Sequence, residues 1–228
     1  SFPALKRSTT VLQSRLADDS ADAPFSARNY QTNLTADAVI QFGMVVMPDA
    51  GTDGRFDVNG AVGTSAIGVL AGTGPSAQGT AYGVVVAGLA YVVPDTAVSV
   101  TRGHFLLAGT NPGTVSDSAS IGAAGITIGK ALYSEATDVL VSATATTDVI
   151  VLTSAPGWAV DDPVVFYTAG GAAIAGLTSG NVYWIKTISS ATITLSATKG
   201  GAVVDITVDG VITTQYLIRL PQAIIGVQ

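Results

Sequence analysis

The sequence predicts an all-β fold: a β-barrel-like or sandwich-like core domain, an extended N-terminal arm and an inserted small β domain. Three features support this prediction. The chain of 228 residues is rich in Val, Ile, Ala and Thr and contains 26 Gly, which is typical of short strands joined by tight turns. Strand-like runs recur about every 8–12 residues between turn residues. Charged residues make up only 11%, against about 25% in an average soluble domain, so we expect other subunits to cover part of the surface.

The first segment, residues 1–36, differs from the rest of the chain. It holds four of the ten basic residues, and its apolar residues are sparse and irregular. The stretch from Thr10 to Leu16 allows a short helix, and the acidic run after it is typical of a loop. Two interpretations are a flexible tail and an arm that lies over a neighbouring subunit, and we favour the arm. The residues expected to contact that neighbour are Phe2, Pro3, Leu5, Lys6, Arg7 and Arg15.

Residues 37–143, together with 214–228, are predicted to form the core domain. Its strand-like segments are 39–47, 66–71, 82–93, 97–100, 105–108, 126–133 and 139–142. A Gly-, Asn-, Pro- and Ser-rich stretch at 109–120 is predicted to be a loop. This spacing of short strands favours a barrel or sandwich.

Three strand-like segments share a step of Ile followed by Gly: Ile67-Gly68, Ile128-Gly129 and Ile225-Gly226. A glycine inside a strand usually marks a bulge or the close approach of another backbone. Because the third copy lies at the C-terminal end, we expect the last strand to return to the core domain. The segment 144–213 is then an insertion.

The insertion is predicted to be a small β module. Its strand-like runs are 149–153, 164–168, 182–188, 192–196, 203–208 and 211–214. Asp209-Gly210 lies between the last two runs and is the strongest hairpin signal in the chain.

Trp158, Tyr167, Tyr183 and Trp184 also lie in the insertion. These aromatic residues can pack the core of the module or form a sugar-stacking platform, and the core is favoured. Neighbouring residues of a strand point to opposite faces, so Tyr183 and Trp184 are not expected to share one core. We therefore take Trp158 and Trp184 as candidates for exposed aromatic contacts at an interface.

Residues that usually carry catalysis or bind metals are scarce. The chain has no Cys, one His (His104) and one Glu (Glu135). A Ser-His-Asp triad would have to use His104, yet no Gly-x-Ser-x-Gly motif is present. Asp49, Asp53 and Asp57 suggest calcium by their spacing, but turn formation explains them better. We expect no catalytic residue, no cofactor and no metal site.

Charge and hydropathy exclude two classes of partner. The net charge of −6 disfavours nucleic acid, because phosphate contacts need Lys and Arg. The chain lacks the run of about 20 apolar residues that a membrane-spanning helix requires. The first residues also lack the apolar region of a secretory signal.

Several short motifs resemble the capsid cement (head decoration) proteins of tailed bacteriophages. These motifs are Gly43-Met44-Val45-Val46, Ala66-Ile67-Gly68-Val69-Leu70, Gly83-Val84-Val85-Val86-Ala87-Gly88, Gly103-His104-Phe105-Leu106 and Ile128-Gly129-Lys130-Ala131-Leu132. The resemblance covers residues 38–135 and extends to 215–228. The segment from Ala155 to Ile185 resembles small β modules of phage structural proteins.

The resemblance implies a virion protein on the outer capsid surface, which is not an enzyme. Its expected partners are the major capsid protein and further copies of itself in a homotrimer, where it bridges capsid subunits and stabilises the expanded shell. Two alternatives stay open. One is a tail, fibre or adhesin module that uses the aromatics of 144–213, and the other is a hydrolase built on His104.

Overall fold

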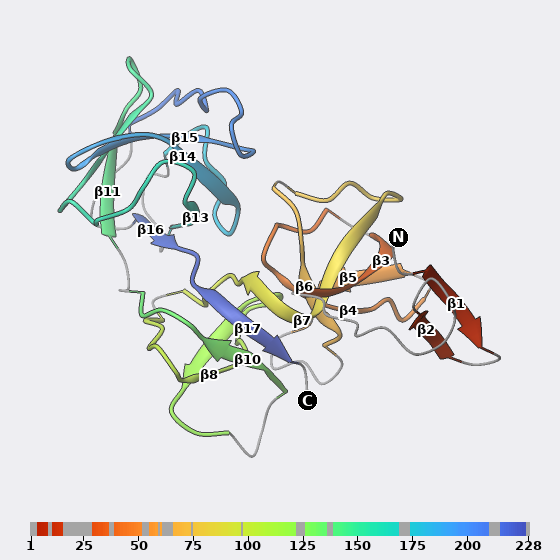
Figure 1. The fold of residues 1–228 in the computed structure, drawn as a ribbon. Helices are drawn as coiled ribbons and strands as arrows, with labels where there is room; N and C mark the ends of the chain where they lie inside the picture. Colours follow the sequence, from red (N-terminus) through yellow and green to blue (C-terminus); the bar gives the residue numbers. More distant parts are fainter. Residues whose placement is uncertain are drawn as a thin grey trace.

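The computed structural model describes most of the chain: residues 4–8, 11–15, 29–36, 39–51, 55–58, 60, 66–73, 75–96, 98–121, 126–135, 139–168, 174–209 and 215–226. These residues form strands β1 to β17 and no helix, so the predicted all-β class is confirmed. In this described part, no helix is long and apolar enough to cross a membrane. Figure 1 shows a small hairpin, a large sheet and a barrel.

The N-terminal hairpin consists of β1 (Ala4–Ser8) and β2 (Val11–Arg15), which form a two-stranded antiparallel sheet. The register runs from Ala4 opposite Arg15 to Ser8 opposite Val11. The short helix predicted from Thr10 to Leu16 is therefore wrong. A helix of this length is costly to nucleate, whereas strand pairing gives the same backbone groups partners across the hairpin.

The large sheet contains a closed ring of five strands. They are β3 (Asn29–Ala36), β5 (Arg55–Val58), β4 (Val45–Pro48), β6 (Gly68–Leu70) and β7 (Ala81–Tyr91). The strands pair in that order, and β3 closes the ring by pairing with β7. β3 lies within the segment 1–36 that the sequence assigns to the arm, so the last part of that segment belongs to the sheet. One buried cluster takes a residue from each strand: Ala36, Phe56, Val46, Leu70 and Val84.

The same sheet continues from β7 into four more strands. They are β17 (Gln222–Gly226), β10 (Thr127–Ala131), β8 (Phe105–Ala108) and β9 (Val115–Ser118). β9 lies within the stretch 109–120 that the sequence predicts as loop. An isolated bridge between Val115 and Pro94 joins β9 to the chain just after β7. This half of the sheet therefore also curls around a core, which contains Leu106, Ile128 and Ile225.

The strands β4, β6 and β7 separate the two cores. Val45, Val69 and Val85 face one buried cluster, and Val46, Leu70 and Val84 face the other. Strands buried on both faces are expected to be continuously apolar rather than alternating. This explains the Gly- and Val-rich runs that give the sequence its high hydropathy.

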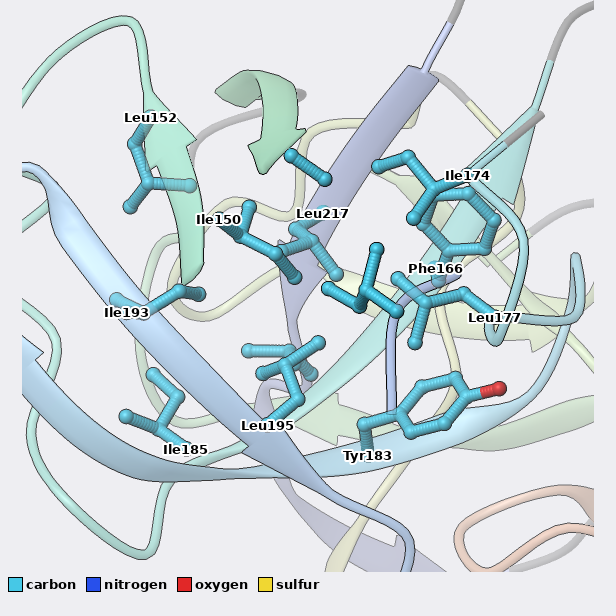
Figure 2. Close-up of a cluster of buried hydrophobic side chains, with 13 residues drawn as sticks. Ile150, Leu152, Phe166, Ile174, Leu177, Tyr183, Ile185, Ile193, Leu195 and Leu217 are labelled. Carbon is cyan, nitrogen blue, oxygen red and sulfur yellow. The ribbon is translucent and has the colours of Figure 1, made fainter. Parts of the chain in front are cut away.

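The closed barrel has six strands in the order β11-β12-β15-β14-β13-β16. Their bounds are β11 (Val139–Thr144), β12 (Val149–Leu152), β15 (Thr192–Ser196), β14 (Val182–Ser189), β13 (Pro163–Thr168) and β16 (Gln215–Arg219). Large apolar side chains fill its interior, as Figure 2 shows, with Ile150, Phe166 and Leu195 among them. The barrel strands extend beyond the predicted module 144–213 at both ends, so the predicted boundaries fall inside the barrel.

The hairpin predicted around Asp209-Gly210 is not formed by regular strands in the described residues. Val203 and Val208 make only isolated bridges, to Ser196 and Ala175. Within the run 203–208, Ile206 is instead buried in the interior cluster of the barrel. The run 211–214 lies outside the described residues.

Two glycines of the repeated Ile-Gly step lie where another backbone approaches. A Cβ atom on Gly68 would come within 2.5 Å of the carbonyl oxygen of Val85, and one on Gly129 would clash with the carbonyl oxygen of Ile224. The register of β10 against β8 also shifts beside Gly129. The sequence predicts both features. The third glycine, Gly226, has open space around its Cβ position.

Candidate functional site: the joint between sheet and barrel

An apolar contact joins the barrel to the sheet. In β14, Tyr183 faces the barrel interior, so its neighbour Trp184 faces outwards, and there it meets Phe42 of the sheet. The two rings are stacked with their centroids 5.4 Å apart. Trp184 is only 3% exposed, so the exposed position predicted for it is wrong. Tyr183 and Trp184 do point to opposite faces of the strand, as predicted, but the sheet of the same chain covers Trp184.

Three hydrogen bonds between uncharged groups cross this joint. The Tyr167 hydroxyl donates to the carbonyl oxygen of Pro94 at 2.9 Å, and burial raises the pKa of Tyr167 well above its usual range. The Val182 amide donates to the Gln41 side chain at 3.3 Å, and the Lys199 amide donates to the carbonyl oxygen of Thr73 at 3.1 Å. Together with the apolar contact, these bonds fix the barrel against the sheet.

Arg219, at the end of β16, connects two carboxylates at the same joint. Its Nε and one terminal nitrogen donate to the two carboxylate oxygens of Glu135 at 3.0 and 2.8 Å. Its other terminal nitrogen donates to Asp162 at 3.1 Å. Such a two-point contact between a guanidinium and a carboxylate is strong and directional. Burial raises the pKa of Glu135 above its usual range, although the Arg219 hydrogen bonds partly offset this.

A cleft of about 220 Å³ lies beside this charged group. Its lining combines two aromatic rings, the three charged residues, one amide and one leucine: Tyr91, Tyr133, Glu135, Asp162, Arg219, Leu220 and Gln222. The sheet contributes Tyr91 and Gln222, while the barrel contributes Arg219 and the turn before β13 contributes Asp162. The cleft therefore exists only because the two parts are held together.

A second polar group, around Asp95, is structural. The Asp95 carboxylate is buried and accepts hydrogen bonds from Thr110, Asn111, Thr114 and Ser116. Burial alone would raise the pKa of Asp95, but the hydrogen bonds from Thr110, Asn111 and Thr114 bring it below its usual value. Its carboxylate is fully used in holding the turn before β9, so it has no free capacity for a ligand.

The structure places His104 at the turn before β8, beside Asp117 of β9. Its Nδ1 lies 2.7 Å from an Asp117 carboxylate oxygen, which supplies two members of a possible triad. Among the described residues, the His104 ring has no hydrogen bond to a serine hydroxyl.

Of the Asp residues considered for calcium, Asp49 is a turn residue, whereas Asp57 lies in β5. Asp49 accepts a hydrogen bond from the Gly51 amide at 3.1 Å, and Asp57 accepts one from the Val58 amide at 2.6 Å. Asp53 lies outside the described residues. In the part of the chain that is described, no three His, Asp or Glu side chains are grouped as metal ligands.

The predicted arm residues fall in the hairpin or before it. Leu5, Lys6 and Arg7 lie in β1 and Arg15 lies in β2, while Phe2 and Pro3 lie outside the described residues. Trp158 is half-buried against the interior cluster of the barrel. The two aromatic candidates thus lie in the barrel, whereas the described arm residues lie in the hairpin.

The sequence prediction missed Arg219, Asp162 and Asp95 as members of polar groups. A signal for one of them was present: Arg219 is a lone charge in an apolar strand, and such a residue needs a buried partner. Glu135, the one Glu of the chain, is that partner. Comparison of the chain with known families, curated proteins and solved structures finds no match.

Proposed function

We propose that the chain is a structural virion protein that binds the outer surface of a phage capsid and stabilises the expanded shell by bridging capsid subunits. The proposal originates in the resemblance of its Gly- and Val-rich motifs to capsid cement proteins. Its proposed partners are the major capsid protein and further copies of the chain in a homotrimer. Neither nucleic acid nor membrane is a proposed partner, and the proposed role involves no catalysis.

The observation that carries the proposal is the N-terminal hairpin. β1 and β2 form a sheet of their own, separate from the sheet that contains β3 to β10 and β17 (Figure 1). A two-stranded hairpin alone is at best marginally stable in water, so contacts with a second molecule would stabilise it. Residues 4–15 also carry three cations and no acid, in a chain whose net charge is −6. This favours an acidic partner surface.

The joint between barrel and sheet suits a bridging role. A protein that strengthens a shell must transmit force between the subunits that it contacts, so its own parts must not move independently. A contact of standard size buries about 1,600 Å², and repetition over a shell multiplies a modest contact. The acidic body does not compete for packaged DNA.

A copy count tests the proposal. Purified protein is mixed with expanded capsids of its parent phage that lack decoration, and the bound protein is measured by gel densitometry. Saturation at a fixed ratio to the major capsid protein, near one to one or one trimer per local threefold position, supports the cement role.

Little binding, or a handful of copies per particle, would contradict the cement role. The alternative is then a tail, fibre or adhesin component. Trp184 cannot serve that alternative as an exposed aromatic because it is buried, which leaves Trp158 as the aromatic candidate in the barrel.

A further inference from the structure

We infer that the cleft between sheet and barrel, lined by Tyr91, Tyr133, Asp162, Arg219 and Gln222, is a binding site for one uncharged sugar ring. This inference is independent of capsid binding, because it concerns a different part of the molecule from the hairpin. It also places a glycan site that neither Trp158 nor Trp184 lines.

Unused hydrogen-bonding groups converge on the cleft. Within the described residues, the hydroxyls of Tyr91 and Tyr133 and the side-chain amide of Gln222 have no hydrogen-bond partner. Asp162 uses one carboxylate oxygen, which accepts from Arg219 and from the Ala159 amide, and its other oxygen is unused. A ligand with several donors and acceptors close together matches these groups.

The charges of the cleft favour a neutral ligand. Glu135 and Asp162 are two carboxylates, so an anion would be repelled. Arg219 already occupies the position between them, at 2.8 Å from Glu135 and 3.1 Å from Asp162, so a cationic side chain would have to displace it. Hydroxyl groups can donate to the carboxylates and accept from the guanidinium without changing this balance of charge.

Size and shape favour a single ring. The cleft of about 220 Å³ is smaller than the roughly 300–1,000 Å³ of pockets for drug-sized ligands. Tyr133 is 56% exposed, which leaves its aromatic ring open to the apolar face of a sugar. An exposed Tyr beside hydrogen-bonding groups combines an apolar body and a polar end in one side chain. For so small a ligand we expect a dissociation constant on the order of 1 mM.

The test uses the full chain and the methyl glycosides of glucose, galactose, mannose and N-acetylglucosamine as probes. Saturation-transfer NMR and titrations of amide chemical shifts are expected to show saturable binding of at least one probe. Tyr133→Ala and Gln222→Ala are each expected to weaken it by about tenfold, while Trp158→Ala, the matched control for the barrel aromatic, leaves it unchanged. Tyr133 is exposed, and the Gln222 side chain has no hydrogen-bond partner in the described part of the chain, so both variants should fold, which their melting temperatures verify.

Three results would overturn the inference. They are the absence of saturable binding to the folded protein, binding that is lost in Trp158→Ala but kept in Tyr133→Ala, and binding that neither cleft variant weakens. None of these results bears on the copy count with capsids, so the two proposals stand or fall separately.

Discussion

At the scale of single residues, Asp95 shows how one buried charge orders a loop. The side chain is 2% exposed, yet its carboxylate accepts hydrogen bonds from both the backbone and the side chain of Thr110 and of Asn111. These donors lie on the turn between β8 and β9. Because Asp95 itself follows β7, the carboxylate ties this turn to a distant part of the same sheet.

Asp95→Asn is expected to lower the free energy of unfolding by about 2–3 kcal/mol at neutral pH, because an amide would place a donor against donors. The pKa of Asp95 is lowered in the folded protein, so its stabilising contribution is present above the ordinary value of 3.8 and is lost as the pH falls below it. Urea unfolding from neutral pH to about pH 3 measures both effects.

The control for this prediction is Asp49→Asn. Asp49 accepts a hydrogen bond from Gly51 at an exposed turn, so its replacement should change stability by no more than about 0.5 kcal/mol. An equal loss in both variants would show that the Asp95 hydrogen bonds have no special weight.

At the scale of elements, the β1–β2 hairpin is the part whose removal should separate folding from attachment. Because β3 begins at Asn29 and pairs with β7, a truncation that removes residues 1–28 leaves every strand of the sheet and barrel in place. We expect the truncated protein to keep its melting temperature and to lose capsid binding. Sedimentation with expanded capsids measures the loss, and full binding by the truncated protein would disprove the role of the arm.

The Ile-Gly steps give a second prediction at this scale. Gly129→Ala should lower the free energy of unfolding by about 2–3 kcal/mol, because its Cβ would clash with the backbone of Ile224. Gly226→Ala is the matched control, since it shares the preceding Ile and has open space at the Cβ position. Chemical denaturation compares the two, and equal stabilities would show that strands β10 and β17 separate at no cost.

Elements also show where sequence reasoning succeeds and where it fails. The Ile-Gly step predicted close backbone approaches at Gly68 and Gly129, because only glycine lacks the atom that would clash there. The helix proposed for Thr10 to Leu16 was wrong, because the residues of so short a segment take their conformation from the strand that pairs with them. The helix or strand propensity of a short segment says little about its conformation when the strand that pairs with it lies outside that segment.

At the scale of the whole molecule, the joint around Phe42 and Trp184 should determine whether barrel and sheet behave as one body. Phe42→Ala is expected to lower the free energy of unfolding by about 3–5 kcal/mol and to uncover Trp184. In a Trp158→Phe background Trp184 is the remaining Trp, because the chain has two. Quenching of its fluorescence by acrylamide should therefore increase under native conditions.

Phe56→Ala provides the control for the joint. Phe56 is fully buried in the core enclosed by the five-stranded ring, away from the joint. Its truncation should therefore lower the free energy of unfolding by a similar amount without affecting the quenching of Trp184. Equal quenching in the two variants would mean that the Phe42 contact does not hold the joint closed.

The polar contacts of the joint could not be predicted, because the residues that form them lie far apart in the sequence. Arg219 and Glu135 are 84 positions apart in the chain. The need of each for a partner is visible in the sequence, but their meeting depends on the barrel returning the chain beside its point of departure. The cleft forms because the chain returns to this point, so no short sequence motif marks it.

The connection of the barrel to the sheet has an evolutionary consequence. β10 and β17 are antiparallel neighbours, with Ala131 opposite Ala223, so the chain leaves and re-enters the sheet at adjacent points and the barrel takes the place of a hairpin turn. A domain held in this way can be acquired, discarded or exchanged in one recombination event, and the order of the strands stays the same. A domain that replaces the barrel must cover Phe42 and Tyr91 of the sheet. Otherwise, both residues would have to be substituted by polar ones. Within that limit, the sheet can hold different domains at the position of the barrel.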